Sequence, residues 1–132
     1  MKKEIYHVFV EGIPKPQPRP RKGKHGNFYS PDPCGWKEVI QACFLQKRQP
    51  IIQGPVFLTI HFLFHKNGMK ENECKLHTQK PDKDNLEKAV MDALTGIGIW
   101  KDDCQIYGGT TAKYWTAGKS GAKIWIEEVV NE

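Results

Sequence analysis

The amino-acid sequence predicts an α+β fold in a single domain, with a mixed or antiparallel β-sheet packed with two main helices. Its 132 residues suit one domain, and a hydrophobic content of 39% is enough for one core. Two amphipathic helical patterns occur among four segments rich in β-branched and aromatic residues, with no internal repeat. We therefore assign residues 1–132 to one domain.

The strand segments are recognised by their residue types and by the glycines and prolines that bound them. The second strand segment, residues 56–64, is the most hydrophobic and is expected to be central in the sheet. A polar stretch at residues 66–81 is expected to be a loop. The four expected strands cover residues 5–10, 56–64, 104–115 and 122–130.

The two helices are predicted from apolar residues that recur every three or four positions. In the first, residues 35–47, aromatic side chains follow this spacing, and Pro50 stops the pattern. The second, residues 85–95, has one apolar stripe and is followed by Gly96. Asp84 is expected to be its N-cap, in a capping box with Glu87.

Residues 13–27 form a basic, proline-rich arm within the domain. Its prolines fix φ and remove backbone donors, which excludes a helix or a central strand and favours an extended, polyproline-like segment. The net charge of the chain is +5, and the N-terminal third of the chain sets most of the positive field, which is typical of a protein that binds nucleic acid. For the basic loop by itself, a solvated linker is an equal alternative. The cationic side chains expected to contact phosphates are Lys15, Arg19, Arg21, Lys22 and Lys24.

The cysteines and the apolar runs indicate a cytoplasmic protein that does not enter a membrane. Cys34, Cys43, Cys74 and Cys104 are far apart and lack the paired spacing of a zinc site, so we expect reduced thiols. The longest apolar runs are far shorter than the ~20 residues that span a bilayer. No apolar segment typical of a signal peptide follows the first lysines.

Two aspartates stand just before the second expected helix. Asp82 and Asp84 are two residues apart, so in an extended approach their carboxylates point the same way and repel each other unless a cation lies between them. Mg²⁺ suits such a pair because it prefers oxygen ligands and completes its shell with water and phosphate. The pattern alone is common by chance, and its alternatives are an N-cap at Asp84 and a solvated charge at Asp82.

Three further charged residues are candidates for the same site. Lys88 follows Asp84 by one helical turn on the face opposite the apolar stripe, where it could stabilise charge on a phosphate or simply pair with Asp92. Strand alternation favours Asp103 over Asp102 as a third ligand, with Asp102 in a supporting position. The short connection at residues 96–101 is expected to bring Asp103 near Asp84.

These residues resemble the RusA family of Holliday-junction resolvases, which is common in bacteria and their prophages. The resemblance rests on the pattern Asp-x-Asp-Asn-Leu-x-Lys at residues 82–88, Asp-Ala-Leu-Thr at 92–95, and Trp-x-Asp-Asp-x-Gln-Ile at 100–106. A looser match covers the Gly-x-Pro and Arg-Pro-Arg elements of the arm and Tyr-x-Pro at 29–31. The chain departs from the family at Gln17, where members often carry a lysine.

The resemblance implies a RusA-like fold, Mg²⁺ as the cofactor with Mn²⁺ as a substitute, and a homodimer that makes paired symmetric nicks in four-way DNA junctions. It implies that Asp82, Asp84 and Asp103 bind the metal and that Lys88 is essential to cleavage. Asp102 would be a supporting acidic residue. Lys113 matches a family lysine and is expected to contact DNA.

The expected function is therefore that of a crossover junction endodeoxyribonuclease. In such an enzyme a metal polarises the phosphoryl oxygen and activates the attacking water, while basic residues position the DNA backbone without reading bases. One alternative is a branched-DNA-binding protein that does not cut. The other is a metal-dependent hydrolase of small nucleotides, for which the basic arm would have no purpose.

Overall fold

A computed structural model describes residues 1–17, 20–23, 26–29 and 35–130, and describes side chains for residues 1–17 and 35–130. The main sheet has five strands in the order β1-β7-β4-β6-β5. The pair β4 and β6 is parallel, and the other neighbours are antiparallel, so the sheet is mixed as predicted. These strands are β1 (Lys2–Glu11), β4 (Val56–His65), β5 (Cys74–Leu76), β6 (Ile106–Thr116) and β7 (Gly121–Val129).

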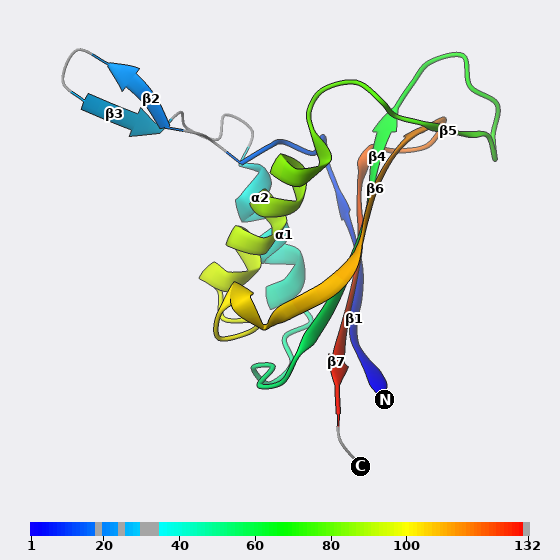
Figure 1. The fold of residues 1–132 in the computed structure, drawn as a ribbon. Helices are drawn as coiled ribbons and strands as arrows, with labels where there is room; N and C mark the ends of the chain where they lie inside the picture. Colours follow the sequence, from blue (N-terminus) through cyan, green and yellow to red (C-terminus); the bar gives the residue numbers. More distant parts are fainter. Residues whose placement is uncertain (18–19, 24–25, 30–34, 131–132) are drawn as a thin grey trace.

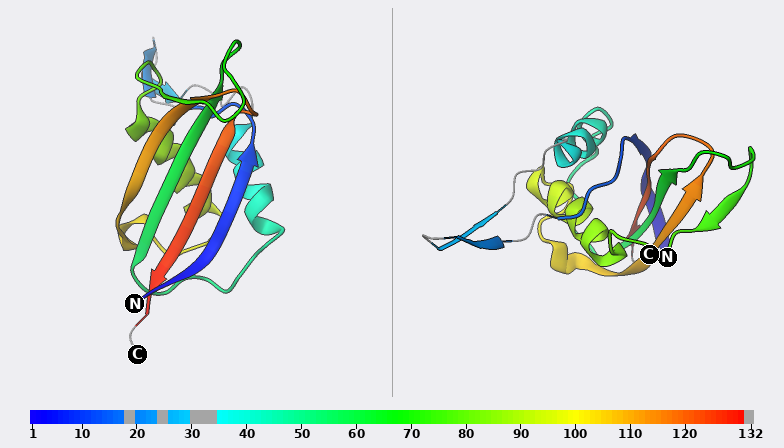
Figure 2. Two further views of the ribbon diagram at one scale, coloured as in Figure 1. Left: turned by 90° about the vertical axis from the view of Figure 1, so that its right-hand side faces the viewer. Right: turned by 90° about the horizontal axis from the view of Figure 1, so that it is seen from above.

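Both helices, α1 (Trp36–Leu45) and α2 (Lys83–Gly96), pack on the same face of the sheet (Figures 1 and 2). Alternation along the strands explains the core. In β4 every second residue from Val56 to Phe64 is buried against the helices. The stripe predicted on α2 is also buried, from Leu86 to Leu94. The α+β prediction is thus confirmed, with each helix supplying one apolar face to a shared core.

Three local expectations are corrected. The N-cap of α2 is Asp82, not Asp84, and no side-chain hydrogen bond caps the helix, so the expected capping box is absent. The expected strand at 104–115 begins only at Ile106, after the short 3-10 helix η1 (Asp103–Gln105), because the Asp102 carboxylate caps that turn. The stretch 66–81 contains β5, which adds an edge strand to β6.

The basic arm combines irregular backbone with a β-hairpin. Residues 13–17 have no regular secondary structure, and β2 (Pro20–Gly23) pairs with β3 (Gly26–Tyr29) in a separate two-stranded sheet. The prediction of no helix and no central strand agrees with the described part of the arm. Arg19 and Lys24 lie outside the described residues, as do the side chains of Arg21 and Lys22.

The remaining expectations concern the cysteines and the hydropathy of the helices. Cys43, Cys74 and Cys104 are free cysteines, and Cys34 lies outside the described residues. Across the described ranges, no helix has the length and hydropathy needed to cross a membrane.

Candidate functional site

The Asp82 and Asp84 side chains are exposed at the N-terminal end of α2. Asp82 has extended backbone dihedrals and Asp84 lies in the first helical turn. The Asp84 carboxylate accepts a hydrogen bond of 2.9 Å from the Asn85 N–H. Backbone N–H groups at the start of a helix favour negative charge nearby, which suits acidic side chains at this position. This end of α2 therefore presents two solvent-accessible anionic oxygen donors.

β6 holds the segment that leads into this end of α2. The Lys113 Nζ donates hydrogen bonds to the carbonyl oxygens of Gln79, at 2.5 Å, and Pro81, at 2.7 Å. The His77 N–H donates to the Lys113 carbonyl at 3.1 Å. One turn into the helix, the Thr111 hydroxyl donates to the Glu87 carboxylate. These contacts fix the position of Asp82 relative to the sheet, whereas contact of Lys113 with DNA stays a prediction.

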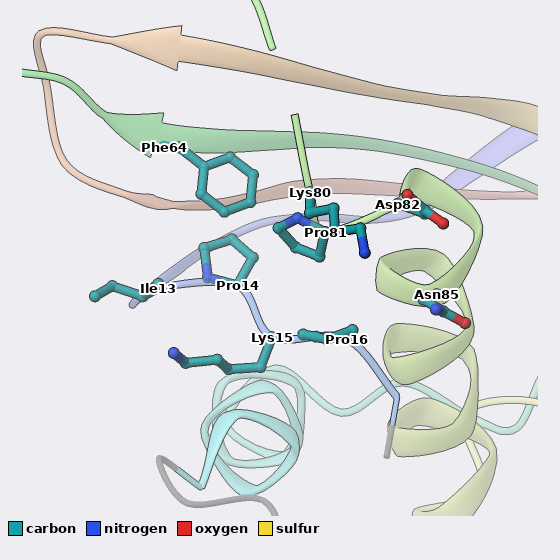
Figure 3. A pocket seen from close by; sticks show the side chains of 9 residues that line it. All are labelled: Ile13, Pro14, Lys15, Pro16, Phe64, Lys80, Pro81, Asp82 and Asn85. Atoms are coloured by element: carbon teal, nitrogen blue, oxygen red, sulfur yellow. The ribbon is translucent and has the colours of Figure 1, made fainter. Parts of the chain in front are cut away.

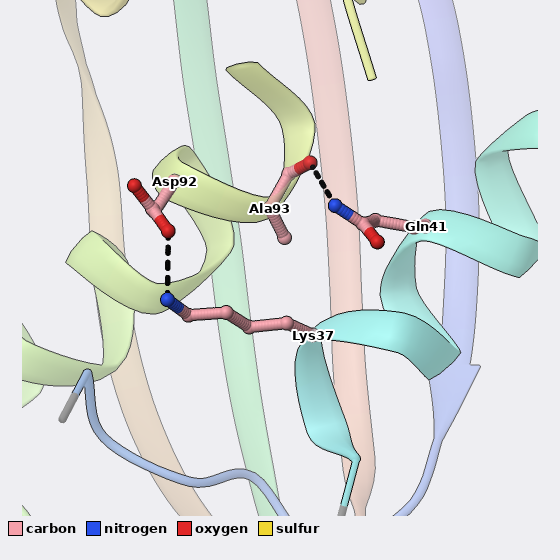
Figure 4. A network of polar contacts seen from close by, with 4 residues as sticks. All are labelled: Lys37, Gln41, Asp92 and Ala93. Atoms are coloured by element: carbon pink, nitrogen blue, oxygen red, sulfur yellow. Dashed lines mark hydrogen bonds and ion pairs between the residues drawn. The ribbon is translucent and has the colours of Figure 1, made fainter. Parts of the chain in front are cut away.

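Lys88 is exposed on α2, one turn after Asp84. The alternative of a Lys88–Asp92 ion pair is not observed. Asp92 forms an ion pair with Lys37 of α1 instead, at 2.7 Å (Figure 4). Beside this pair, the Gln41 side chain donates a hydrogen bond of 3.0 Å to the Ala93 carbonyl. The two helices are thus joined through Asp92, and Lys88 is directed away from the core.

Asp102 and Asp103 lie at η1, before β6. The Asp102 carboxylate accepts a hydrogen bond of 3.0 Å from the Cys104 N–H, and this bond is the main cause that lowers the pKa of Asp102. A hydrogen bond with Asp102 is the main cause that raises the pKa of the exposed Asp103, and slight desolvation and the Asp102 and Asp92 charges raise it further. The two negative charges repel each other, so the pair shares a proton more readily than separate aspartates do. A bound cation would relieve the same repulsion.

The described residues of one chain do not bring Asp103 to the other two aspartates. Asp82 lies at the end of β6 where Lys113 contacts Pro81, whereas Asp103 precedes Ile106 at the other end. At a strand rise of about 3.3 Å per residue, Ile106 and Lys113 are about 23 Å apart. No group of three His, Cys, Asp or Glu side chains in the described part of the chain could hold a metal ion. The expected proximity of Asp103 to Asp84 is therefore wrong within a single chain, because Asp103 follows the C-terminal end of α2.

A pocket of about 580 Å³ lies beside Asp82, between the arm and the start of α2 (Figure 3). The arm contributes the segment Ile13–Pro16, β4 contributes Phe64, and the approach to α2 contributes Lys80 and Pro81. Sequence reasoning assigned Lys15 and Asp82 but missed the pocket. The residues that form it come from three distant segments, and no spacing pattern links them.

The match to a protein-family model decides which family this fold and these residues represent. The model of the endodeoxyribonuclease RusA family matches residues 11–127, which includes the arm, α2 and β6. The chain belongs to the RusA family. The match confirms the resemblance inferred from the aspartate and lysine pattern.

Individual relatives are similar to the chain to different extents. The Bacillus subtilis (strain 168) protein YqaN, named as uncharacterized, is 30% identical over 91% of this chain and 94% of its own length. The crossover junction endodeoxyribonucleases RusA of Escherichia coli K12 and of Enterobacteria phage 82 are each 36% identical over 61 residues. That match spans 46% of this chain and about half, 51%, of those two RusA proteins.

Proposed function

We propose that the chain is a structure-selective endodeoxyribonuclease that resolves four-way DNA junctions by paired, symmetric hydrolysis of phosphodiesters. The observation that carries the proposal is the exposed pair Asp82 and Asp84 at the start of α2, inside a RusA-family match over residues 11–127. The relatives named RusA are crossover junction endodeoxyribonucleases. A substrate recognised by its branched shape suits contacts to phosphates rather than to bases.

The described residues of one chain supply an incomplete metal site. Nucleases of the RusA family are generally metal-dependent, yet no three candidate ligands in the described part of a chain form a group. The exposed carboxylates are oxygen donors, which suits Mg²⁺ or, as a substitute, Mn²⁺. Such a cation supplies charge stabilisation at the phosphoryl oxygen and a water of lowered pKa.

We infer that two chains complete the set, with Asp82 and Asp84 from one and Asp103 from the other. Within one chain these residues lie at opposite ends of α2 and β6, and a two-fold arrangement of two copies, with these elements antiparallel, would bring them together. A homodimer with two-fold symmetry would carry two such sites, as paired nicks in a symmetric junction require. Asp102 would support Asp103 through their shared hydrogen bond.

Lys88 and the basic arm would bind the DNA backbone. Lys88 extends from the exposed side of α2, one turn beyond Asp84, where an ammonium group can stabilise charge on the phosphate during cleavage. Lys15, Arg19, Arg21, Lys22 and Lys24 would neutralise phosphates near the branch, and this would make binding strongly dependent on salt.

One observation favours a second candidate, a branched-DNA-binding protein that does not cut. It is the absence of a three-ligand group within the described part of a chain. The two candidates differ in one measurable property, which is strand cleavage in the presence of a divalent metal.

The test compares a labelled four-way junction, a linear duplex of the same sequence and a nucleoside triphosphate, each with Mg²⁺ and with EDTA. We expect nicking of the junction only, and only with Mg²⁺. Asp84→Asn should abolish cutting but keep junction binding, because it removes an oxygen donor and reduces repulsion toward DNA. Binding without cutting by the unmodified protein would favour the second candidate, and hydrolysis of the triphosphate would favour a nucleotide hydrolase. An Asp84→Asn variant that cuts at the normal rate would overturn the assignment of the site.

A further inference from the structure

The pocket beside Asp82 is open at one side and is built on a firmly held loop (Figure 3). The Gly12 N–H donates to the Ser120 carbonyl at 3.1 Å, and the Gln17 N–H donates to the Asn85 carbonyl at 3.0 Å. The loop between these anchors contains Pro14 and Pro16, whose rings restrict its backbone. The pocket is therefore formed before any ligand arrives, which lowers the entropy cost of binding.

Its walls combine apolar surfaces with positive charge. Phe64 lines it from β4, and Pro14 and Pro81 line it from the arm and from the approach to α2. Phe64 is only 8% exposed and its ring packs at 4.5 Å from that of His77, so this wall is rigid. Lys15 and Lys80 add two cations. Aromatic and proline rings suit the flat face of a base, and lysines suit a phosphate.

The volume and position also fit one nucleotide. At about 580 Å³ the pocket lies within the range of about 300–1,000 Å³ that is usual for small-molecule sites. Asp82 belongs to the same lining, so a strand whose phosphate approaches Asp82 has its neighbouring nucleotide at the mouth of the pocket. A branch point is where bases are easiest to unstack, because the cost is least where pairing is already disturbed.

We propose that this pocket takes one unstacked nucleotide of the cleaved strand, with its base against the Phe64, Pro14 and Pro81 surfaces and its phosphate at Lys15 and Lys80. The inference rests on the proposed junction cleavage and adds a base-binding subsite to it. Capture of the nucleotide would set the position of the scissile phosphate relative to Asp82. Cleavage would then occur at a fixed distance from the captured base.

The test uses junctions that carry 2-aminopurine, a base whose fluorescence rises on unstacking, at single positions around the branch. The protein is the Asp84→Asn variant, so that DNA is bound but not cut. One position should show a rise. Ile13→Trp, added to Asp84→Asn, should abolish it, because Ile13 lines the pocket, is 60% exposed and can carry a larger side chain over the mouth. Ile51→Trp is the matched control, because Ile51 is also an exposed isoleucine, at 39%, and does not line the pocket.

Cleavage measurements complete the test, with each tryptophan substitution made in protein that retains Asp84. Ile13→Trp should lower the cleavage rate about tenfold and change junction affinity less than threefold, whereas Ile51→Trp should change neither; loss of one base stack predicts this size of effect. A junction that is abasic at the responding position should be cut about tenfold more slowly by the unmodified protein, with no further loss from Ile13→Trp.

Two outcomes overturn the subsite: no fluorescence rise at any position, or a rise that Ile13→Trp leaves intact. If either occurs while the unmodified protein cuts junctions, only the subsite fails. If the unmodified protein neither binds nor cuts junctions, the proposed function fails.

Discussion

The Lys113 ammonium group donates a hydrogen bond of 2.7 Å to the carbonyl oxygen of Pro81. This bond joins β6 to the residue directly before Asp82. A side chain on the sheet therefore helps to fix the position of the start of α2 and of its carboxylates. A positively charged residue near a DNA-binding site would ordinarily be taken as a phosphate contact. Here the same ammonium group is engaged with backbone carbonyls, and the two roles make different predictions.

Lys113→Met should reduce cleavage more than binding. Loss of the bonds to Gln79 and Pro81 frees the approach to α2 and displaces Asp82, so we expect about a tenfold lower cleavage rate. Junction affinity and its dependence on salt should stay nearly unchanged. If Lys113 contacted a phosphate instead, Lys113→Met would weaken binding and lower the slope of its salt dependence by about 1. Lys123→Met, an exposed lysine on β7, is the control and should change neither quantity.

Mixed dimers test whether two chains share each metal site. We expect Asp84→Asn and Asp103→Asn to be inactive separately. A heterodimer of the two retains one intact set, because the Asp103→Asn chain supplies Asp82 and Asp84 and its partner supplies Asp103. Purified through two different affinity tags, it should nick one strand of a junction without the paired second cut.

The control for this experiment is a heterodimer of Asp82→Asn and Asp84→Asn, which has no intact set and should stay inactive. If the first heterodimer is as inactive as this control, the three aspartates do not combine across two chains.

Gly109→Ala should strongly destabilise the fold. Gly109 has φ of 146°, a conformation that side chains disfavour, and an added Cβ would overlap the Leu58 carbonyl oxygen on the neighbouring strand. We expect a loss of more than about 2 kcal/mol in the free energy of unfolding, measured by denaturant titration. Gly118→Ala is the control: its new Cβ would find its nearest neighbour, the Thr116 hydroxyl, at 3.6 Å. Equal stability of the two variants would contradict this account of β6.

His77 should make the protein less stable in mild acid. It lies between the rings of Phe64 and Trp115, at 4.5 and 4.1 Å, and burial, followed by the Lys113 charge, lowers the pKa of His77 below its usual 6.5. The unfolded chain then binds more protons than the folded chain, so the contribution to stability is complete above pH 6.5 and is lost as the pH falls below it. His77→Phe should reduce the loss of unfolding free energy between about pH 7.5 and about pH 5.

The pKa of His65 is shifted in the opposite direction to that of His77, so His65 provides a comparison. It is exposed, and hydrogen bonds with Asn67 and then with the Gly118 carbonyl raise the pKa of His65. Its contribution is therefore present at low pH and is lost as the pH rises through its folded pKa. His65→Gln should leave the acid sensitivity unchanged or slightly larger. A His77→Phe variant with the acid sensitivity of the unmodified protein would show that His77 does not cause it.

The sequence by itself determined the local features of this protein. The apolar spacing in β4 and α2 predicts which faces are buried, because strand and helix periods depend only on neighbouring residues. The proline-rich arm could not form a helix or a central strand for the same local reason. The pattern across residues 82–106, which includes Asp82, Asp84 and Lys88, was specific enough to indicate the RusA family, and the family match confirms it.

Only the tertiary structure decided which of these features lie near one another. It places Asp103 at the opposite end of β6 from Asp82, and it ties Lys113 to the carbonyl of Pro81. It also joins the arm, Phe64 and the start of α2 into one pocket. These relationships depend on the parallel pairing of β4 with β6 and on the packing of α2 across them. Such contacts form between residues far apart in the chain, so no spacing within a single segment could reveal them.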